Sequence, residues 1–259
     1  MKRSLLPLVL SAIALVAQSA SAVTLYDNSN IRTGTGNGFM GADTSAIATG
    51  ATIFGFSENG TGTPQVLLAD RFTLASTSMI SSISFDAYST SNYPFPPVSP
   101  FTSASLSIYS GVPGSGGVVL FTSNTLSMTA WTGIYRVTQT TLTNAQRPVM
   151  TLSMAFPNVS LAAGTYYAAW TVTGVAAPGN PGSIFNPPVM NPDGTLPVGT
   201  ALQSIDGGTT WLALTDTGSG TRVSLPLTVN GTVVPEPSTI GLMFLCGGGL
   251  ALFKIRKRH

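Results

Sequence analysis

The sequence predicts an all-β protein built as two packed antiparallel sheets in a jelly-roll-like sandwich. Three observations favour this fold class. Residues 23–234 are rich in Thr, Ser, Gly and Pro and contain no long run of helix-forming residues. Short stretches alternate apolar and polar residues, as strands with one buried face do. Turn residues separate these stretches.

Alternation is clearest in two stretches. Within residues 74–88, the apolar side chains of Ile83, Phe85 and Ala87 alternate with polar ones, and residues 104–109 repeat the pattern around Leu106 and Ile108. Further strands are predicted at residues 118–122, 134–142, 149–156, 165–172, 202–205, 210–214 and 222–229. We expect about ten to twelve strands and no helix in this part of the chain.

The N-terminus has the features of a secretory signal peptide. Lys2 and Arg3 are followed by an apolar stretch over residues 5–17 and by small residues at Ala20 and Ala22. This order is typical of an export signal that is cleaved after a small residue. We therefore predict that residues 1–22 are removed and that the mature chain begins at Val23.

The C-terminus has three parts in a fixed order. The motif Pro235, Glu236, Pro237 lies within residues 234–238 and interrupts any helix, because proline lacks a backbone N–H group. Residues from Ile240 to Phe253 are all apolar or glycine, and a basic tail follows with Lys254, Arg256, Lys257 and Arg258. As a helix, the apolar stretch spans ~21 Å, short of the ~30 Å hydrocarbon core, which favours a transient transmembrane helix.

This order resembles the PEP-CTERM sorting signal of Gram-negative bacteria. The resemblance implies processing near the motif by an exosortase-type membrane enzyme and a basic tail on the cytoplasmic side of the inner membrane. It also implies an association with exopolysaccharide production and biofilm formation. The segment between the signals is similar to extracellular β-sandwich domains found with such anchors, through short motifs at residues 69–72, 80–85, 106–109 and 161–167.

Three regions follow: a signal peptide at 1–22, an extracellular β-sandwich at 23–233 and a sorting signal at 234–259. The segment 23–234 contains five arginines, no lysine and eight acidic residues, so its net charge is −3. This mildly acidic balance gives no support for nucleic-acid binding. The single cysteine, Cys246, lies in the apolar tail, so no internal disulfide is expected.

One turn motif is complete. Ser204, Asp206, Gly208, Thr210 and Trp211 fit the pattern called the Asp-box, which resembles the repeated hairpin turns of sialidase propellers. The motif occurs once, whereas a propeller needs it in every blade. We interpret it as one structural β-hairpin; a calcium or ligand site there is the alternative.

Residue types argue against an enzyme. The only histidine is His259 in the basic tail, so the body offers no Ser-His triad, no Cys nucleophile and no His-containing metal site. Carboxylate chemistry remains, but no pair of acids is marked in the sequence. Asp27, Asp43, Asp70 and Asp216 are alternatives as calcium ligands, although no loop has the required spacing. No metal or cofactor is predicted.

The leading hypothesis is a non-enzymatic surface or matrix protein associated with extracellular polysaccharide. The alternative is a carbohydrate-binding module that uses aromatics on two proline-rich loops, residues 92–101 and 176–197. Its candidates are Tyr93, Phe95 and Phe185, which either stack on sugar rings or fold back onto the sandwich. A glycosidase-type enzyme is the third hypothesis.

Overall fold

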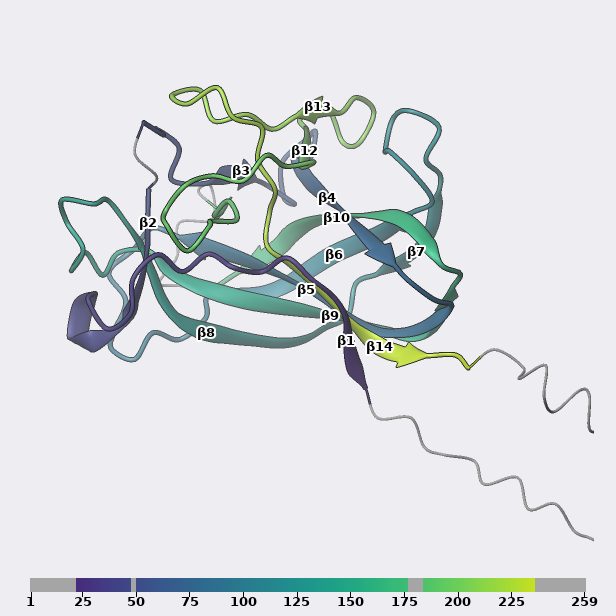
Figure 1. Ribbon diagram of the computed structural model, residues 1–259, viewed down its shortest axis with the longest axis horizontal. Helices are drawn as coiled ribbons and strands as arrows, with labels where there is room; N and C mark the ends of the chain where they lie inside the picture. The colour runs from purple at the N-terminus through teal and green to yellow at the C-terminus, as the bar shows by residue number, and fades with distance from the viewer. Residues whose placement is uncertain (1–21, 48–49, 177–183, 236–259) are drawn as a thin grey trace, which may run out of the picture.

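The structure is a computed structural model, described here for residues 22–47, 50–176 and 184–235. These residues form fourteen strands and one short 3-10 turn, η1 (Phe39–Gly41). Figure 1 shows how the strands are arranged. The predicted all-β class with two sheets is confirmed. Within the described ranges, no helix has the length and hydrophobicity needed to cross a membrane.

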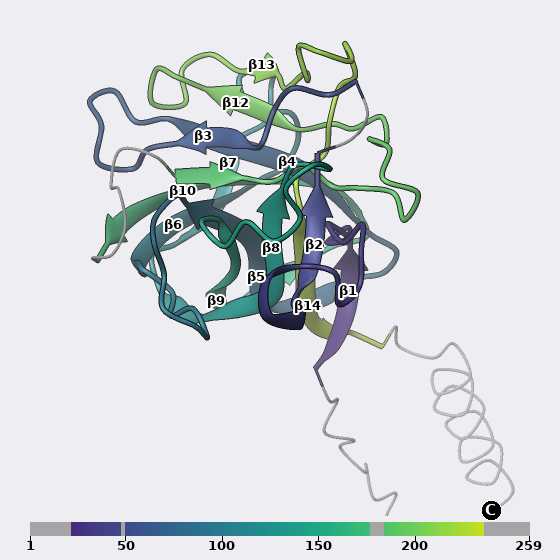
Figure 2. The same cartoon turned by 90° about the vertical axis from the view of Figure 1, so that its left-hand side faces the viewer.

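The larger sheet has eight strands. Its main path runs β1-β14-β5-β9-β8-β2, and β11 and β3 extend it beside β5. The strands are β1 (Val23–Asp27), β2 (Asp43–Ala46), β3 (Phe56–Glu58), β5 (Ser78–Ser89), β8 (Leu126–Val137), β9 (Pro148–Leu161), β11 (Ile184–Asn186) and β14 (Leu227–Val233). All pairings are antiparallel except β2 with β8, which lie side by side and parallel (Figure 2).

The smaller sheet has six strands in the order β13-β12-β4-β10-β6-β7, all antiparallel. Its members are β4 (Leu67–Leu74), β6 (Phe101–Tyr109), β7 (Val119–Ser123), β10 (Gly164–Val175), β12 (Leu202–Ser204) and β13 (Leu212–Ala213). β10 lies between β4 and β6, so its alternate side chains face the other sheet.

The main core fills the space between the two sheets. The ring of Trp170 on β10 stacks on that of Phe85 on β5, with centroids 5.1 Å apart and planes inclined by 23°. Both side chains are almost fully buried. Burial of each such side chain contributes about 1.5–3 kcal/mol. The indole N–H of Trp170 donates to Oδ1 of Asn186 at 3.0 Å, so its polar atom is satisfied.

The sequence prediction was wrong at several boundaries. Fourteen strands exceed the expected ten to twelve. No strand was predicted at β1, β2 or β3, β4 was marked only by the short motif at residues 69–72, and β11 lies within the loop predicted at residues 176–197. The strand predicted at residues 134–142 begins earlier, at Leu126, and ends at Val137. Thr138 then turns the chain, with its hydroxyl hydrogen bonded to those of Thr140 and Thr141.

The outer face of the larger sheet is partly covered, which the alternation did not predict. Tyr88 and Val149 point outward from β5 and β9, yet both are buried. Together with Ile31 and Ile134 they form a second hydrophobic cluster, against which Phe54 and Phe185 pack. Segments after β1 and before β3 therefore lie over this face and enclose side chains that alternation alone assigns to solvent.

Candidate functional site

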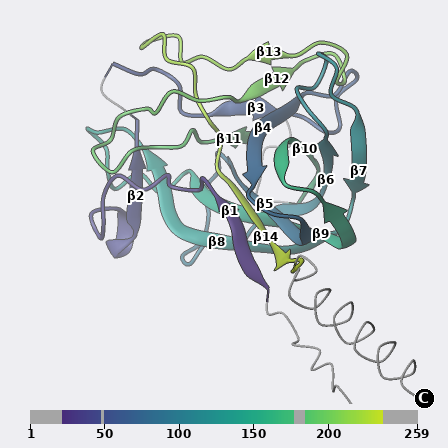
Figure 3. The ribbon, with the colours of Figure 1, turned by 45° about the vertical axis from the view of Figure 1, so that its right-hand side comes forward.

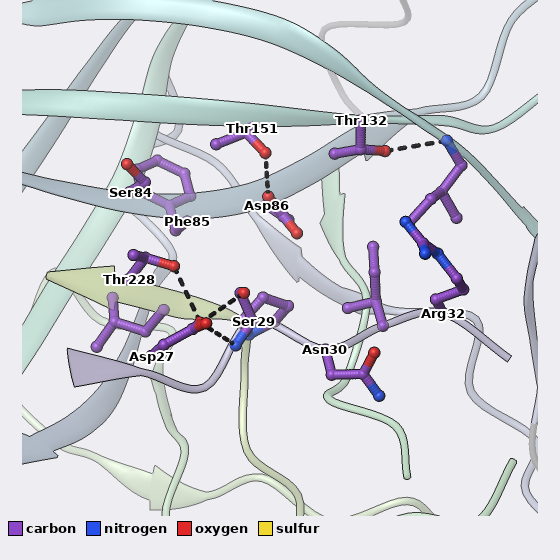
Figure 4. A pocket seen from close by; sticks show the side chains of 14 residues that line it. Asp27, Ser29, Asn30, Arg32, Ser84, Phe85, Asp86, Thr132, Thr151 and Thr228 are labelled. Atoms are coloured by element: carbon purple, nitrogen blue, oxygen red, sulfur yellow. Dashed lines mark hydrogen bonds between the residues drawn. The ribbon is translucent and has the colours of Figure 1, made fainter. Parts of the chain in front are cut away.

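A polar cleft of about 420 Å³ lies between the outer face of the larger sheet and the segment that follows β1 (Figure 4). The floor comes from β5, β8, β9 and β14, and the cover from the segment after Asp27. The cleft residues with polar side chains are Asp27, Ser29, Asn30, Arg32, Ser84, Asp86, Thr132, Thr151 and Thr228.

The strand register explains why the floor is polar. Ser84 on β5 lies opposite Thr228 on β14 and opposite Ser153 on β9, and Asp86 lies opposite Thr151. Side chains two residues apart on a strand share a face, so these residues project outward while Phe85 points to the core. The hydroxyls of Ser84 and Ser153 are hydrogen bonded at 2.7 Å.

Asp86 is the central titratable group of the cleft. Its side chain is only 6% exposed, and Oδ1 accepts a hydrogen bond of 2.7 Å from the hydroxyl of Thr151. Figure 4 shows the other oxygen pointing into the cleft. Burial raises the pKa of Asp86 to about 7, the bond from Thr151 opposes this rise, and the nearby charge of Asp27 adds to it. Near neutral pH the carboxyl group can therefore both donate and accept.

The rim of the cleft carries both signs of charge. Asp27 ends β1, and its Oδ1 accepts from the backbone N–H of Ser29 at 3.0 Å and from the Ser29 hydroxyl at 2.6 Å. Thr228 on the neighbouring β14 donates to the same oxygen at 3.3 Å. Arg32 forms an ion pair with Asp43, whose Oδ2 lies 2.8 Å from Nε. These bonds fix the rim before any ligand arrives.

The cleft is suited to binding a polar ligand through many hydrogen bonds. Hydroxyl, amide and carboxyl groups line it, and its one cationic side chain, Arg32, is ion-paired with Asp43. The two carboxyl groups, Asp27 and Asp86, are the only acids among the lining residues, and the sequence did not mark them as a pair. The one feature of the sequence that could have indicated this site is Asp86, an acid within a Ser-rich strand of alternating residues.

The four acids considered as alternative calcium ligands do not form a metal-binding group in the described ranges. Asp70 is buried and accepts from the backbone N–H groups of Arg71 and Leu225. Asp216 accepts from the backbone N–H groups of Thr52 and Ile53. Across the described ranges, no group of three or more acids, histidines or cysteines is arranged to hold a metal ion.

The loop aromatics behave differently from one another. Phe185 stacks on Tyr88 with centroids 5.7 Å apart, and the hydroxyl of Tyr93 is hydrogen bonded to that of Ser89, so both pack against the sandwich. Phe95 stays 47% exposed, with its ring edge-on to Phe39 and Trp131 at 6.0 and 5.8 Å. Of the three candidates, Phe95 alone presents a large part of its ring to solvent.

The Asp-box motif lies on the hairpin between β12 and β13. Asp206 accepts from the hydroxyl of Ser204 at 2.8 Å, and from the hydroxyl of Thr210 at 2.6 Å. These bonds lower the pKa of Asp206 to about 2, with the Thr210 hydroxyl as the largest cause. The indole of Trp211 donates to the carbonyl of Gly208 at 3.0 Å. Every Asp206 contact serves the turn itself.

The predicted targeting residues lie mostly outside the described ranges. Ala22 and Pro235 are within them. Ala20, Glu236, Pro237, the apolar stretch from Ile240 to Phe253 and the basic tail are not. Comparison with known protein families and with curated proteins finds no significant match to this chain.

Proposed function

We propose that the protein is exported and carried to the cell surface or extracellular matrix by its PEP-CTERM-like signal. In this proposal an exosortase-type enzyme processes it while residues 240–253 are held transiently in the inner membrane. The mature, jelly-roll-like sandwich then binds extracellular polysaccharide, as part of a biofilm matrix, without catalysing a reaction.

The limits of the sandwich support the export part of the proposal. β1 begins at Val23, directly after the predicted cleavage site, and β14 ends at Val233, directly before the sorting motif. The two strands pair antiparallel, with Val23 opposite Gly231. Both predicted processing points therefore adjoin the same end of the domain, and cutting at either leaves every strand intact.

The cleft supports the polysaccharide part, and the observation that carries it is Asp86. One oxygen of a nearly buried carboxyl group points, without a protein partner among the described contacts, into a pre-formed polar space. This oxygen is accessible from the cleft, so a ligand hydroxyl can hydrogen bond to it in place of water. Neutral sugars offer many hydroxyls, which fits a cleft lined mainly by hydroxyl, amide and carboxyl groups.

Binding is tested with the mature protein on an array of polysaccharides and oligosaccharides. We expect binding that is weakened about tenfold or more by Asp86→Ala, because loss of one buried hydrogen-bonding group costs roughly 1–3 kcal/mol. Asp206→Ala is the matched control, since its contacts are confined to the Asp-box turn. Equal binding by wild type and Asp86→Ala, or no binding to any glycan, would count against the cleft.

Sorting is tested separately with Glu236→Ala in the native host. We expect full-length protein to accumulate in the membrane, because the motif is read by the processing enzyme in this proposal. Intact mass of the surface protein reports both cleavage points. Normal processing of this variant would contradict the sorting assignment and leave the binding result untouched.

The exposed ring of Phe95 favours a second candidate, a carbohydrate platform at one end of the sandwich. Phe39, Phe95, Trp131 and Tyr135 form a chain of ring contacts, with neighbouring centroids 5.5–6.2 Å apart. Aromatic rings offer flat apolar area at low entropy cost. If Phe95→Ala abolishes glycan binding and Asp86→Ala does not, the platform is the binding site.

A further inference from the structure

Strand β7 forms an exposed, apolar edge of the smaller sheet. Figure 3 shows it as the outermost strand on the side away from β2. It pairs with β6, and no strand within the described ranges pairs with its other side. Val118, Val119, Leu120 and Phe121 are 60, 51, 39 and 37% exposed. Four consecutive large apolar residues on an open edge are unusual, because such an edge can pair with another chain.

The backbone of this edge has hydrogen-bonding groups to offer. The carbonyl of Val118 accepts from the N–H of Ser110 at 3.0 Å, and its N–H donates to the Ser110 hydroxyl at 3.2 Å. Along an antiparallel strand, successive residues direct these groups to opposite sides. The groups of Val119 therefore point away from β6.

The far end of the edge is closed. The hydroxyl of Ser123 donates to the carbonyl of Ala155 on β9 at 2.6 Å, which ties this end of the strand to the other sheet. The register also shifts at Leu120, which is the extra residue of a bulge. The part that remains open is residues 118–122, about the length of a short strand.

The usual protections of an open edge are mostly absent. Natural edges carry charges, lysine, proline or a bulge that discourages pairing. Here only the bulge is present, and every residue between Asp86 and Arg136 is uncharged, which includes all of β6 and β7. Two identical strands can therefore lie side by side without opposing like charges.

We propose that the β7 edge binds the β7 edge of a second copy of this chain. Two identical antiparallel strands related by a two-fold axis present donors to acceptors in both directions, so the edge is complementary to itself. The exposed apolar side chains of residues 118–121 then cover one another. This pairing joins two six-stranded sheets into one and is independent of the cleft and of any sugar.

The contact is small, since a specific interface normally buries about 800 Å² on each partner. Association in the micromolar range is therefore expected, enough to assemble copies where they are concentrated.

Sedimentation of the purified full-length chain in detergent tests the proposal. We expect a concentration-dependent dimer that is weakened at least about tenfold by Val119→Lys, which brings two like charges close together across the two-fold axis. Val198→Lys is the matched control, because Val198 is 85% exposed and lies outside β7. It should sediment as wild type does.

A site-specific crosslink gives a second measurement. With Cys246→Ser to remove the native thiol, Val119→Cys should form a disulfide dimer under mild oxidation much faster than Val198→Cys. A monomeric wild type at about 100 μM, a dimer unchanged by Val119→Lys, or equal crosslinking at the two positions would each overturn the proposal. A dimer held together by the apolar tail would survive Val119→Lys and so count against β7.

Discussion

Replacing Asp86 by Asn should remove a pH-dependent loss of stability. The substitution keeps the Oδ1 acceptor for the Thr151 hydroxyl and changes only the group that faces the cleft. In the folded protein the pKa of Asp86 is raised to about 7 from an ordinary value of 3.8. Below about pH 4 both folded and unfolded chains are protonated at this residue, so wild type pays no penalty there.

Between about pH 4 and pH 7 the unfolded chain ionises while the folded chain holds its proton. The free energy of unfolding then falls as pH rises, by about 1.4 kcal/mol for each pH unit. The accumulated loss is on the order of 4 kcal/mol above pH 7. Asp27 and Arg32, the other charged groups lining the cleft, are present in both proteins, and the repulsion between Asp27 and ionised Asp86 is one cause of the raised pKa in wild type.

Urea unfolding at several pH values between 4 and 8 measures the effect. The stability of Asp86→Asn relative to wild type should grow by roughly 4 kcal/mol from pH 4 to pH 8. Glu58 also has a pKa raised to about 7 by burial, so both proteins keep a residual fall with pH. Parallel profiles for the two proteins would refute the claim that Asp86 is buried as a neutral acid.

Three further substitutions test the packing. Arg136 is buried and donates to the carbonyl of Phe54 and the hydroxyl of Ser45. Arg136→Met should therefore lower the free energy of unfolding by about 3 kcal/mol or more. The control Arg222→Met, at an exposed residue, should have little effect. The hydroxyl of Tyr88 is buried without a hydrogen-bond partner, so Tyr88→Phe should raise the melting temperature, with a gain of about 1 kcal/mol. A Cβ at Gly199 would lie 1.9 Å from the carbonyl carbon of Val223. Gly199→Ala should therefore destabilise the fold by more than about 2 kcal/mol, as measured by chemical denaturation. The control Gly111→Ala should be tolerated, because no atom lies closer than 3.7 Å to the added Cβ.

The strands that the sequence located well are those whose alternating apolar residues enter the main core. The stretch predicted at residues 104–109 lies within β6, and that predicted at 165–172 lies within β10. In both, alternating apolar residues such as Leu106 and Trp170 enter the main core. Local periodicity reports such strands directly, because the side-chain repeat of a strand is two residues.

Strands with a different environment were missed or misplaced. In β8, Met128 is 52% exposed while Tyr135, seven residues later, is buried, so one strand passes through two environments. Residues 138–142 looked like a strand because threonine favours strands, yet the hydroxyl of Thr138 is bonded within a turn. Threonine content alone does not distinguish these two cases.

The cleft could not be predicted from the sequence, because it depends on the topology of the sheet. Asp86 alternates with Phe85 and Ala87, so the pattern assigned it to the solvent face. Asp86 is buried because the segment after β1, more than fifty residues earlier in the sequence, covers this part of β5. That segment is held in place because β1 pairs with β14, which in turn pairs with β5. Periodicity reports which face a side chain occupies and carries no information about what covers that face.

Glu58 and Asp86 are buried carboxyl groups whose pKa values are raised alike, to about 7, but their hydrogen-bond partners differ. Glu58 accepts from the backbone N–H of Val172 at 2.7 Å through one oxygen and from the amide of Asn186 at 2.6 Å through the other. Both its oxygens are occupied, and the Asn186 bond continues to Trp170 in the core.

Asp86 has the same high pKa but only one oxygen bonded to protein, and the other points into open polar space. Burying an acid lowers stability, and an apolar residue on β5 would avoid that cost. For Glu58 the cost is offset by bonds that link two sheets of the sandwich. For Asp86 the described contacts provide one hydrogen bond, from Thr151, and the second oxygen faces the cleft, which is why we place the proposed ligand site there.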